Sequence, residues 1–486
     1  MHPEFEAVIG LEVHCQLATE TKIFCSCPAR IPADQSVSEI AVNSNTCPIC
    51  AGHPGTLPVL NQKVVEFAIQ AGLATHSRIN LKNRFARKHY FYPDLPKGYQ
   101  ISQFELPICE NGWLNIETDA GPKKIQIQRI HMEEDAGKNV HMSGFSLVNL
   151  NRAGVPLIEI VTGPDMKTAD EAGAYLRALY AVVTYLGICD GNLQEGNFRC
   201  DANVSVMPKG STVFGTRTEI KNVNSFRFVE KAIEYEIARQ IEVIRSGGRV
   251  VLETRTYDSD KDITISMRSK EEAQDYRYFT EPDLIPLTID EAWIRKIESG
   301  LPELPEQMKS RLVSSLGLSV YDAGVLTGSK TLAEFFDRVV HKLGNPALAK
   351  PAANWVTGEV SRLINEQGIE IQQSRILPEH IADLVRLVHD QVLSSTAAKQ
   401  VLALVWNSGE AVEVIVDREG LKQVSDVGSL DPIIQRVIEG NAKQAADFRS
   451  GKDKLLGFFV GQVMKESGGK ANPALLGELI KKKLLG

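Results

Sequence analysis

The segment KKIQIQRIHMEED, residues 123–135, decides how the first half of the chain folds. Apolar and polar residues alternate from Ile125 to Ile130, which is the period of a half-buried β-strand. The pattern then runs into three adjacent acids, Glu133, Glu134 and Asp135. Like charges at this spacing repel one another, and burying them unpaired is costly. The acids therefore form either a solvated loop or the surroundings of a positive group.

Strand and helix patterns also occur on both sides of this segment. Further strands are expected at residues 7–17, 156–161 and 202–207. A capping-box pattern at Thr168 and Glu171 predicts a helix that reaches Leu186 and stops at Gly187. A second amphipathic helix is expected over residues 226–245, ending at a pair of glycines.

The second half of the chain has a different character. Prolines cluster at positions 282, 286, 302 and 305, which indicates a boundary, and strand patterns almost vanish after it. We therefore predict a mixed α+β N-terminal domain, an all-α helical domain and a small α-helical tail domain. The predicted limits are residues 1–293, 294–408 and 409–486.

Composition narrows the class of protein. The chain has 486 residues, 43% of them hydrophobic, and its apolar runs are far too short to span a membrane. The N-terminus lacks the basic and apolar segments of a secretory signal, so we expect a cytoplasmic protein with no membrane partner. The net charge of −7 argues against a surface built for non-specific nucleic-acid binding but allows a local basic contact.

Four of the eight cysteines have the spacing of a metal site. Cys25 and Cys27 are separated by one residue, and Cys47 and Cys50 by two. Four thiolates from two tight turns can surround one tetrahedral zinc ion and leave no open position, which predicts a structural role. The alternative is four buried thiols without a metal, which is how we interpret the other four cysteines.

Charged residues also stand at strand positions elsewhere in the first domain. A lone Glu159 lies in an apolar strand, and the other acids alternate with apolar neighbours: Glu12 with His14, Asp201 with Asn203 and Ser205, and Glu219 with Lys221. Each has a simple alternative as the solvated face of a strand. Together they suggest one acidic pocket, in which oxygen ligands and an imidazole would suit Mg²⁺ or Mn²⁺ with phosphate. The sequence contains no P-loop motif and no dinucleotide-binding motif.

These segments resemble a known family, the B subunits of the glutamine-dependent aspartyl/glutamyl-tRNA(Asn/Gln) amidotransferases. The resemblance is carried by long motifs spread over nearly the whole chain: IGLEVH (9–14), YFYPDLPKGYQISQ (90–103), HMEEDAGK (131–138), NRAGVPLIEIV (151–161), RCDANVSV (199–206), EIKNVNSF (219–226), DYRYFTEPDL (275–284) and GKANPALLGELIKKKL (469–484). It implies a catalytic cradle, a helical domain and a tail that contacts the body of the tRNA.

The resemblance also implies a reaction, cofactors and partners. ATP with Mg²⁺ phosphorylates the side-chain carboxylate of Glu-tRNA(Gln) or Asp-tRNA(Asn), and ammonia then displaces phosphate to give the amide. A glutaminase A subunit supplies the ammonia, and a small C subunit ties A and B together. Zinc at the cysteines is present in some members of the family and absent from others.

Site residues are carried over from the family motifs by position. The magnesium and catalytic set is Glu12, His14, Glu134 and Glu159, with Lys138 and Arg152 on phosphate or substrate oxygens. The residues expected to bind the nucleotide or line the pocket and the ammonia route are Glu133, Asp135, Asp201, Glu219, Lys221, Asn222 and Ser225. The stretch TYDSDKDITIS (256–266) and Thr280 depart from the family pattern, and neither includes a proposed ligand.

The tail carries a basic patch that also admits two interpretations. Gly469, Lys470, Asn472 and Lys481–Lys483 lie in short helices, where they are expected to contact RNA phosphates. The alternative is a solvated helix end, since cations suit a helix C-terminus.

Two other functions would fit the acids without the family resemblance. One is a two-metal phosphoesterase or nuclease, which would act without ATP and without charged tRNA. The other is a tRNA-binding scaffold in which the acids hold a structural ion, and such a protein would bind tRNA without turning over ATP.

Overall fold

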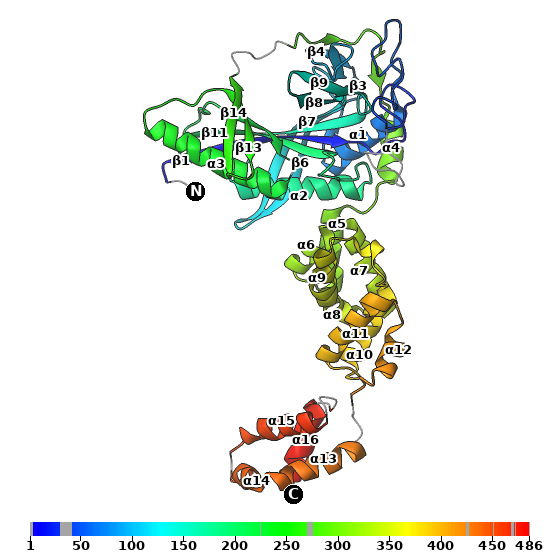
Figure 1. The fold of residues 1–486 in the computed structure, drawn as a ribbon, viewed down its shortest axis with the longest axis vertical. Coiled ribbons are helices and arrows are strands. Elements are labelled where there is room, and N and C mark those ends of the chain that lie inside the picture. Colours follow the sequence, from blue (N-terminus) through cyan, green and yellow to red (C-terminus); the bar gives the residue numbers. More distant parts are fainter. Residues whose placement is uncertain are drawn as a thin grey trace. The chain divides into compact units, whose positions relative to one another are not determined.

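The computed structural model describes residues 3–29, 41–223, 225–269, 276–423, 427–450, 452–467, 471 and 473–485. The chain divides into two compact units, residues 1–305 and 306–486. The first unit is mixed α+β and the second is helical, which confirms the predicted fold class (Figure 1). Among the described residues, no helix combines the length and apolarity that crossing a membrane requires.

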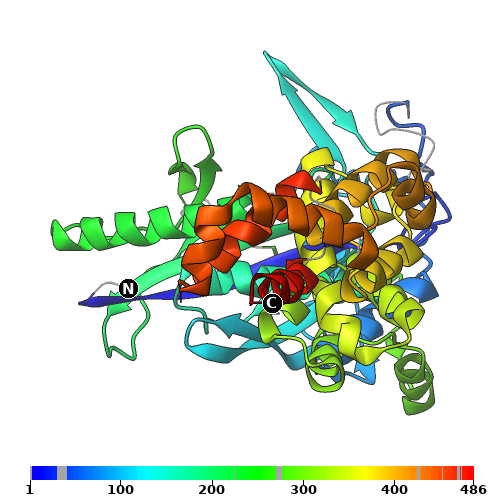
Figure 2. The same ribbon diagram turned by 90° about the horizontal axis from the view of Figure 1, so that it is seen from below.

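One large sheet dominates the first unit. In spatial order its nine strands, counted over the described residues, are β14 (Ile263–Ser269), β13 (Glu253–Asp258), β12 (Thr218–Val223), β11 (Phe198–Pro208), β1 (Phe5–Gln16), β10 (Pro156–Thr162), β7 (Gly121–Glu134), β6 (Cys109–Thr118) and β2 (Arg78–Ile79). Neighbouring strands are antiparallel except β12 and β13. β1, in dark blue, runs across this unit from the N-terminus in both views (Figures 1 and 2).

Helices cover one face of this sheet. They are α1 (Gln62–Ala74), α2 (Ala169–Tyr185), α3 (Phe226–Arg245) and α4 (Glu291–Ser299). On β1 the odd residues, such as Leu11 and Val13, pack into the core with Leu176 of α2 and Ile233 of α3. The even residues, Gly10, Glu12, His14 and Gln16, therefore face the opposite side of the sheet, because strand side chains alternate.

The predicted elements are confirmed, with one informative difference. β1, β10 and β11 match the expected strands, and α2 begins after Thr168, whose side chain accepts a hydrogen bond from the Glu171 N–H. β7 continues through Glu134, so two of the three acids belong to the strand itself and are buried there. A solvated loop is thereby excluded for these two residues.

Smaller elements surround the sheet. Three small sheets among the described residues consist of β15 (Phe279–Thr280), β4 (Ala86–His89) and β5 (Tyr99–Ser102); β16 (Leu287–Thr288) and β3 (Lys82–Asn83); and β8 (Lys138–Met142) and β9 (Phe145–Asn149). In the first of these, Arg87 of β4 donates to both carboxylate oxygens of the buried Glu281, at 2.8 and 2.9 Å. This pair fixes the segment after β15 against β4.

The second unit consists of helices. They are α5 (Pro305–Leu316), α6 (Val320–Thr327), α7 (Lys330–Leu343), η2 (Pro346–Leu348), α8 (Ala349–Asn354), η3 (Trp355–Val360), α9 (Ser361–Gln367), η4 (Ile371–Gln373), α10 (Pro378–His389), α11 (Ser395–Ser408), α12 (Val412–Arg418), α13 (Val427–Gly440), α14 (Ala442–Arg449), α15 (Leu455–Glu466) and α16 (Pro473–Leu485). The last four helices enclose an apolar core that includes Ile434, Phe448, Phe459 and Ile480.

Candidate active site

Three side chains from three neighbouring strands converge on one point. His14 of β1, Glu133 of β7 and Glu159 of β10 each offer a ligand atom, and these atoms lie within 4.8 Å of one another. His14 Nε2 is 3.4 Å from Glu159 Oε2 and 3.8 Å from Glu133 Oε1. The register explains the meeting, because His14 pairs with Glu159, and Glu159 pairs with His131, two residues before Glu133. We call His14, Glu133 and Glu159 the ligand trio.

A second imidazole, that of His131, lies beside the ligand trio. Its Nε2 is 3.4 Å from Glu159 Oε2. Burial acts to lower the pKa of His131, but Glu159 and Glu133 outweigh it and raise the pKa to about 9. Burial acts to raise the pKa of Glu159, but His131 and His14 hold this pKa well below its usual range. Without a metal ion, the carboxylates are therefore balanced by imidazolium charge.

The donor set of the trio fits a hard divalent cation. Mg²⁺ is usually held by one or two carboxylates and completes its shell with waters and substrate phosphates. The trio supplies two carboxylates and one imidazole, which leaves coordination positions for phosphate oxygens. The Nδ1 atoms of His14 and His131 are buried and have no hydrogen-bond partner within the part of the chain that the structure describes.

Glu12 belongs to a neighbouring group. It accepts a hydrogen bond from Asn203 Nδ2 at 2.9 Å and pairs with Asp201 across β1 and β11. Lys221 bridges the remaining acids, with Nζ 3.1 Å from both Asp201 Oδ2 and Glu219 Oε1. Burial, followed by the charges of Glu159, Glu219 and Asp201, raises the pKa of Glu12. Glu12 thus faces the same side of the sheet as the trio without joining its three ligand atoms.

Asp135 anchors the loop that follows β7. It accepts hydrogen bonds from Gln16 Nε2 at 2.7 Å and from Arg199 Nη2 at 3.1 Å, and Arg152 Nε lies 3.5 Å away. Arg152 also donates to the backbone carbonyls of residues 136 and 137. Both Asp135 and Arg152 therefore hold the loop, and Lys138 is exposed at the start of β8. Arg199 was not among the expected site residues.

Glu134 points away from the ligand trio, which corrects the expectation that it joins Glu12, His14 and Glu159. It forms an ion pair with Lys97 and accepts a hydrogen bond from the Ile101 N–H at 2.8 Å. It also lines a cavity of about 240 Å³ whose wall includes Cys25 and Cys50. Adjacent strand residues face opposite sides of a sheet, so only one of Glu133 and Glu134 can reach His14 and Glu159. The residue that does so is Glu133.

Lys88 is a further cation near the trio, and sequence reasoning missed it. It lies on β4 with Nζ 5.2 Å from the centre of the Tyr276 ring. Burial acts to lower the pKa of Lys88, but the charges of Glu133, Tyr278 and Glu159 outweigh burial and raise it. The segment ARKH has no periodic pattern, so only the packing of β4 and the tyrosines reveals this position.

The four predicted cysteines come together. Their sulfur atoms lie within 4.8 Å of one another, with Cys50 Sγ 3.9 Å from Cys47 Sγ and 4.0 Å from Cys27 Sγ. The fully buried Lys22 directs Nζ to Cys50 Sγ at 3.7 Å and to the Asn45 carbonyl at 2.9 Å. The cluster can hold a tetrahedral metal ion, and the lysine ammonium offsets part of the thiolate charge.

The remaining expected residues lie near β12 or in the tail. Ser225 is the N-cap residue of α3 and forms no side-chain cap hydrogen bond. Asn222 lies in β12, but its side chain is outside the described residues. Gly469, Lys470 and Asn472 of the tail are also outside them.

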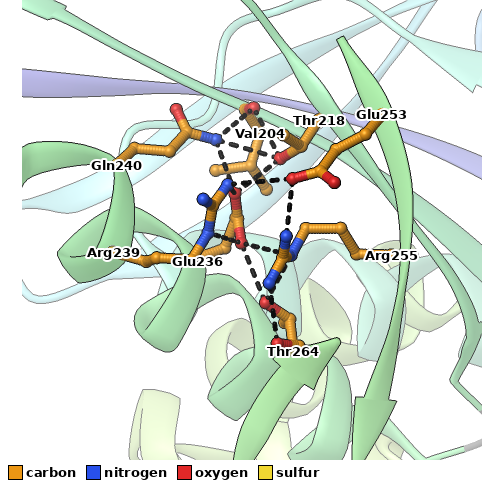
Figure 3. A network of polar contacts seen from close by, with 8 residues as sticks. All are labelled: Val204, Thr218, Glu236, Arg239, Gln240, Glu253, Arg255 and Thr264. Carbon is orange, nitrogen blue, oxygen red and sulfur yellow. Dashed lines mark hydrogen bonds and ion pairs between the residues drawn. The ribbon is translucent and has the colours of Figure 1, made fainter. Parts of the chain in front are cut away.

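A buried charge network supports β12 from the side of α3 (Figure 3). Its centre is Glu236, which has no exposed surface and accepts hydrogen bonds from Thr218 at 2.8 Å and Thr264 at 2.9 Å. Arg239 donates to both oxygens of Glu236, and Arg255 Nε lies 3.3 Å away. The network joins α3 to strands β11 to β14 through the following residues: Val204, Thr218, Glu236, Arg239, Gln240, Glu253, Arg255 and Thr264.

Family models match almost the whole chain. The model described as the GatB/GatE catalytic domain matches residues 7–295, and the model described as the GatB domain matches residues 334–484. Both matches lie where the structure has the α+β unit and the helical unit, respectively.

Three relatives that match over their full length carry the name of the B subunit of aspartyl/glutamyl-tRNA(Asn/Gln) amidotransferase. The protein of this name from Trichlorobacter lovleyi is 56% identical over 483 residues, which covers 99% of this chain and 100% of the relative. The Geobacter sulfurreducens protein is 57% identical over 487 residues, with 99% and 100% covered. The Halorhodospira halophila protein is 52% identical over 486 residues, again with 99% and 100% covered.

Proposed function

The chain belongs to the family of aspartyl/glutamyl-tRNA(Asn/Gln) amidotransferase B subunits, and we propose that the ligand trio is its carboxylate-activating centre. As a member, it is a component of an ATP-dependent, glutamine-hydrolysing carbon–nitrogen ligase of protein biosynthesis, which amidates misacylated tRNA. The observation that carries the proposal is the convergence of His14, Glu133 and Glu159 on the open face of the sheet.

The chemistry has two steps. A side-chain carboxylate oxygen of Glu-tRNA(Gln) or Asp-tRNA(Asn) forms a bond to the γ-phosphorus of ATP, the bond to the β–γ bridging oxygen breaks, and ADP leaves. Ammonia then forms a bond to the activated acyl carbon, and inorganic phosphate leaves with its oxygen. Phosphoryl transfer requires chiefly positioning and charge neutralisation.

The chain's own residues have separate tasks in this proposal. His14, Glu133 and Glu159 would hold Mg²⁺, which supplies charge neutralisation for the phosphate oxygens. Lys88 binds an oxygen of the transferring phosphoryl group, since its pKa is raised and it stays protonated near neutral pH. Asp135, held by Arg199 and Gln16, fixes the end of β7 and with it the position of Glu133.

The cysteine cluster is proposed to bind a structural zinc ion. Four sulfur ligands leave no position for a substrate, so this ion has no direct part in the reaction. Its contribution is to hold residues 22–29 and 45–50 together beside Lys97 and Glu134.

Domains, partners and location complete the proposal. The cradle at residues 1–293 carries the chemistry, residues 294–408 form the helical domain, and residues 409–486 contact the body of the tRNA. Lys481 and Lys482 of α16 are exposed, as a phosphate contact requires. The protein works in the cytoplasm with a glutaminase A subunit and a small C subunit.

The test uses the complex of this chain with its A and C partners, Glu-tRNA(Gln), Mg-ATP and free ammonium, which bypasses glutamine hydrolysis. Glu133→Gln is expected to abolish the formation of both ADP and Gln-tRNA(Gln). Glu134→Gln is expected to retain measurable formation of both products, because the Glu134 carboxylate pairs with Lys97 and does not contact the trio. Glu110→Gln, which removes a carboxylate paired with Arg78 on β2, is the control. Unchanged ADP formation in Glu133→Gln would refute the assignment.

A wild-type complex that forms no ADP with either Glu-tRNA(Gln) or Asp-tRNA(Asn) would favour the scaffold function. Hydrolysis of a phosphoester in the absence of ATP and charged tRNA would favour the phosphoesterase.

A further inference from the structure

Arg199 lies directly beside the ligand trio on the neighbouring strand β11. It pairs with His14 across β1 and β11. Residues that pair in this way share one face of a sheet, with Cβ atoms about 5 Å apart. The residues before and after Arg199, Phe198 and Cys200, pack into the core, so the Arg199 side chain belongs to the open face.

The acids around the Arg199 guanidinium have other cations as partners. Burial acts to lower the pKa of Arg199, but Asp135, Glu133 and Asp201 outweigh burial and raise it, so the group stays charged. The second cation beside each acid, in the same order, is Arg152 at 3.5 Å, His131 at 3.8 Å and Lys221 at 3.1 Å. Balancing the charge of these acids therefore does not depend on Arg199 alone.

Asp135 keeps several partners without Arg199. It accepts hydrogen bonds from Gln16 Nε2 at 2.7 Å and from the Ala136 N–H at 2.9 Å, and Arg152 lies beside it. Arg152 also donates to the backbone carbonyls of residues 136 and 137, which fixes the same loop. Anchoring the end of β7 therefore does not by itself account for an arginine at position 199.

Arg199 has hydrogen-bond donors left for a ligand. Within the part of the chain that the structure describes, its side chain makes one hydrogen bond, from Nη2 to Asp135 Oδ1 at 3.1 Å. A guanidinium carries five N–H donors in a planar fork that matches the geometry of a phosphate group. The side chain is 31% exposed, so the remaining donors are within reach of a ligand on the open face.

We propose that Arg199 binds an oxygen of the transferring phosphoryl group and stabilises the charge that develops there, which deepens the proposed function and rests on it. The side-chain carboxylate oxygen of the substrate bonds to the γ-phosphorus while the bond to the β–γ bridging oxygen breaks, and the electron pair of that bond leaves with ADP. Negative charge is then spread over the three phosphoryl oxygens. Arg199 donates to one of them and Lys88 to another.

The two cations reach the phosphoryl group from different sides of the trio. Lys88 lies on β4, which pairs with β5, and β5 contacts the end of β7 through the Ile101 N–H and Glu134. Arg199 lies on β11, which is separated from β7 by β1 and β10. The phosphoryl group is therefore held between two cations above the trio, as a transition state with charge on several oxygens requires.

The first test measures ADP formation by the full complex with its A and C partners, Glu-tRNA(Gln), Mg-ATP and ammonium. Arg199→Ala is expected to lower kcat by about a thousandfold, while the KM for ATP changes by less than about tenfold. Arg199→Lys should give an intermediate rate, because an ammonium keeps the charge and loses the planar fork.

Added guanidinium ion tests whether the missing group itself is needed. At concentrations far below those that unfold proteins, it is expected to raise the rate of Arg199→Ala by about tenfold. The matched control is Arg245→Ala, which removes an exposed arginine paired with Glu4 on the far end of α3. This variant should form ADP at the wild-type rate with and without guanidinium.

The second test measures binding without turnover. Mg-ADP with aluminium fluoride, which mimics a transferring phosphoryl group, is bound to the full complex in the presence of Glu-tRNA(Gln). Arg199→Ala is expected to weaken this binding by about a hundredfold. Its thermal midpoint stays at the wild-type value, and the nucleotide-free complex binds Mn²⁺, followed by electron paramagnetic resonance, no more weakly than wild type.

Asp135→Asn is expected to show the opposite pattern. Asp135 fixes the end of β7 and with it Glu133, so this variant should weaken Mn²⁺ binding. Its rate of ADP formation should not respond to guanidinium, because no guanidinium group has been removed.

Three results would overturn the proposal. Wild-type ADP formation in Arg199→Ala would show that Arg199 contacts no reacting group. Weakened Mn²⁺ binding in Arg199→Ala, with no response to guanidinium, would make Arg199 a positioning residue that acts through Asp135. An equal loss of Mg-ADP binding without aluminium fluoride would place Arg199 on the nucleotide and not on the transferring group.

A milder variant keeps the test decisive if Arg199→Ala does not fold. Arg199→Gln retains an amide that can donate to Asp135, so it is expected to fold and to lose binding of the aluminium fluoride complex. The proposed function fails only if Glu133→Gln still forms ADP. The present proposal fails if ADP formation requires Glu133 while the Arg199 variants form ADP and bind the mimic as wild type does.

Discussion

Replacing Glu236 by leucine is expected to destabilise the first unit by about 3–5 kcal/mol. The substitution removes a fully buried carboxylate and leaves Arg239 and Arg255 without their central partner. Thr218 and Thr264 also lose the acceptor of their hydroxyl hydrogen bonds. The remaining carboxylate, Glu253, already accepts from Arg255 and lies 3.6 Å from Arg239, so it cannot replace both contacts.

The assay is urea unfolding followed by tryptophan fluorescence. Trp355 and Trp406 lie in the second unit and are replaced by phenylalanine, so that Trp113 and Trp293 report only on residues 1–305. A local probe is needed because two compact units need not unfold as one. The double variant Glu236→Leu/Arg239→Leu should recover part of the loss, since it removes a cation along with the anion.

The same carboxylate predicts a pH dependence. Burial acts to raise the pKa of Glu236, but hydrogen bonds from Arg239, Gln240 and Thr218 outweigh burial and lower it. Its stabilising contribution is therefore complete at neutral pH and is lost as the pH falls below the ordinary glutamate value and through the lowered one. Wild type should lose more stability than Glu236→Leu over that range. A loss below about 1 kcal/mol in the single variant, with no difference in acid, would refute the central role of Glu236.

Two further substitutions test cations near the two candidate metal sites. Lys22→Met is expected to speed the release of zinc bound at the cysteine cluster to a chromogenic chelator by about tenfold, because the substitution removes the ammonium beside Cys50. Lys63→Met, at an exposed position of α1, should leave the release rate unchanged. Equal release rates in the two variants would contradict this role of Lys22. Lys88→Met is expected to lower the rate of ADP formation by about a hundredfold without loss of the fold. The control is Lys124→Met, because Lys124 Nζ also lies over an aromatic ring, 3.9 Å from the centre of Trp113, and its loss should not change the rate. A wild-type rate in Lys88→Met would exclude a phosphate contact.

Periodicity was enough to predict the elements that carry the site. β1, β7 and β11 have clear alternation, β10 is a short apolar run around Glu159, and α2 has a side-chain cap, so local physics and the final fold agree at these places. The four cysteines could be grouped for a similar reason, because short spacings leave few geometries.

Residue identity alone could not choose among adjacent acids. Whether Glu133 or Glu134 reaches His14 depends on the register of β7 against β10, and this register is set by packing across the sheet. Lys88 and Arg199 lie far in sequence from the acids that they serve, so no local pattern marks them. Glu236 is equally hidden, because a glutamate on an amphipathic helix is ordinarily solvated, and only the arrival of β13 and β14 buries it.

The Glu133 and Glu134 side chains point in opposite directions, which restricts where residues can be inserted into or deleted from β7. A one-residue insertion or deletion between Ile125 and Glu134 would exchange the two glutamates, sending one carboxylate away from His14 and the other away from Lys97. Both centres would be lost in a single step, although no ligand had been mutated. The turn between β6 and β7, at residues 118–121, can absorb such a change without altering the end of the strand. Descendants of this sequence should therefore vary in length at the turn and keep a constant count from Ile125 onward.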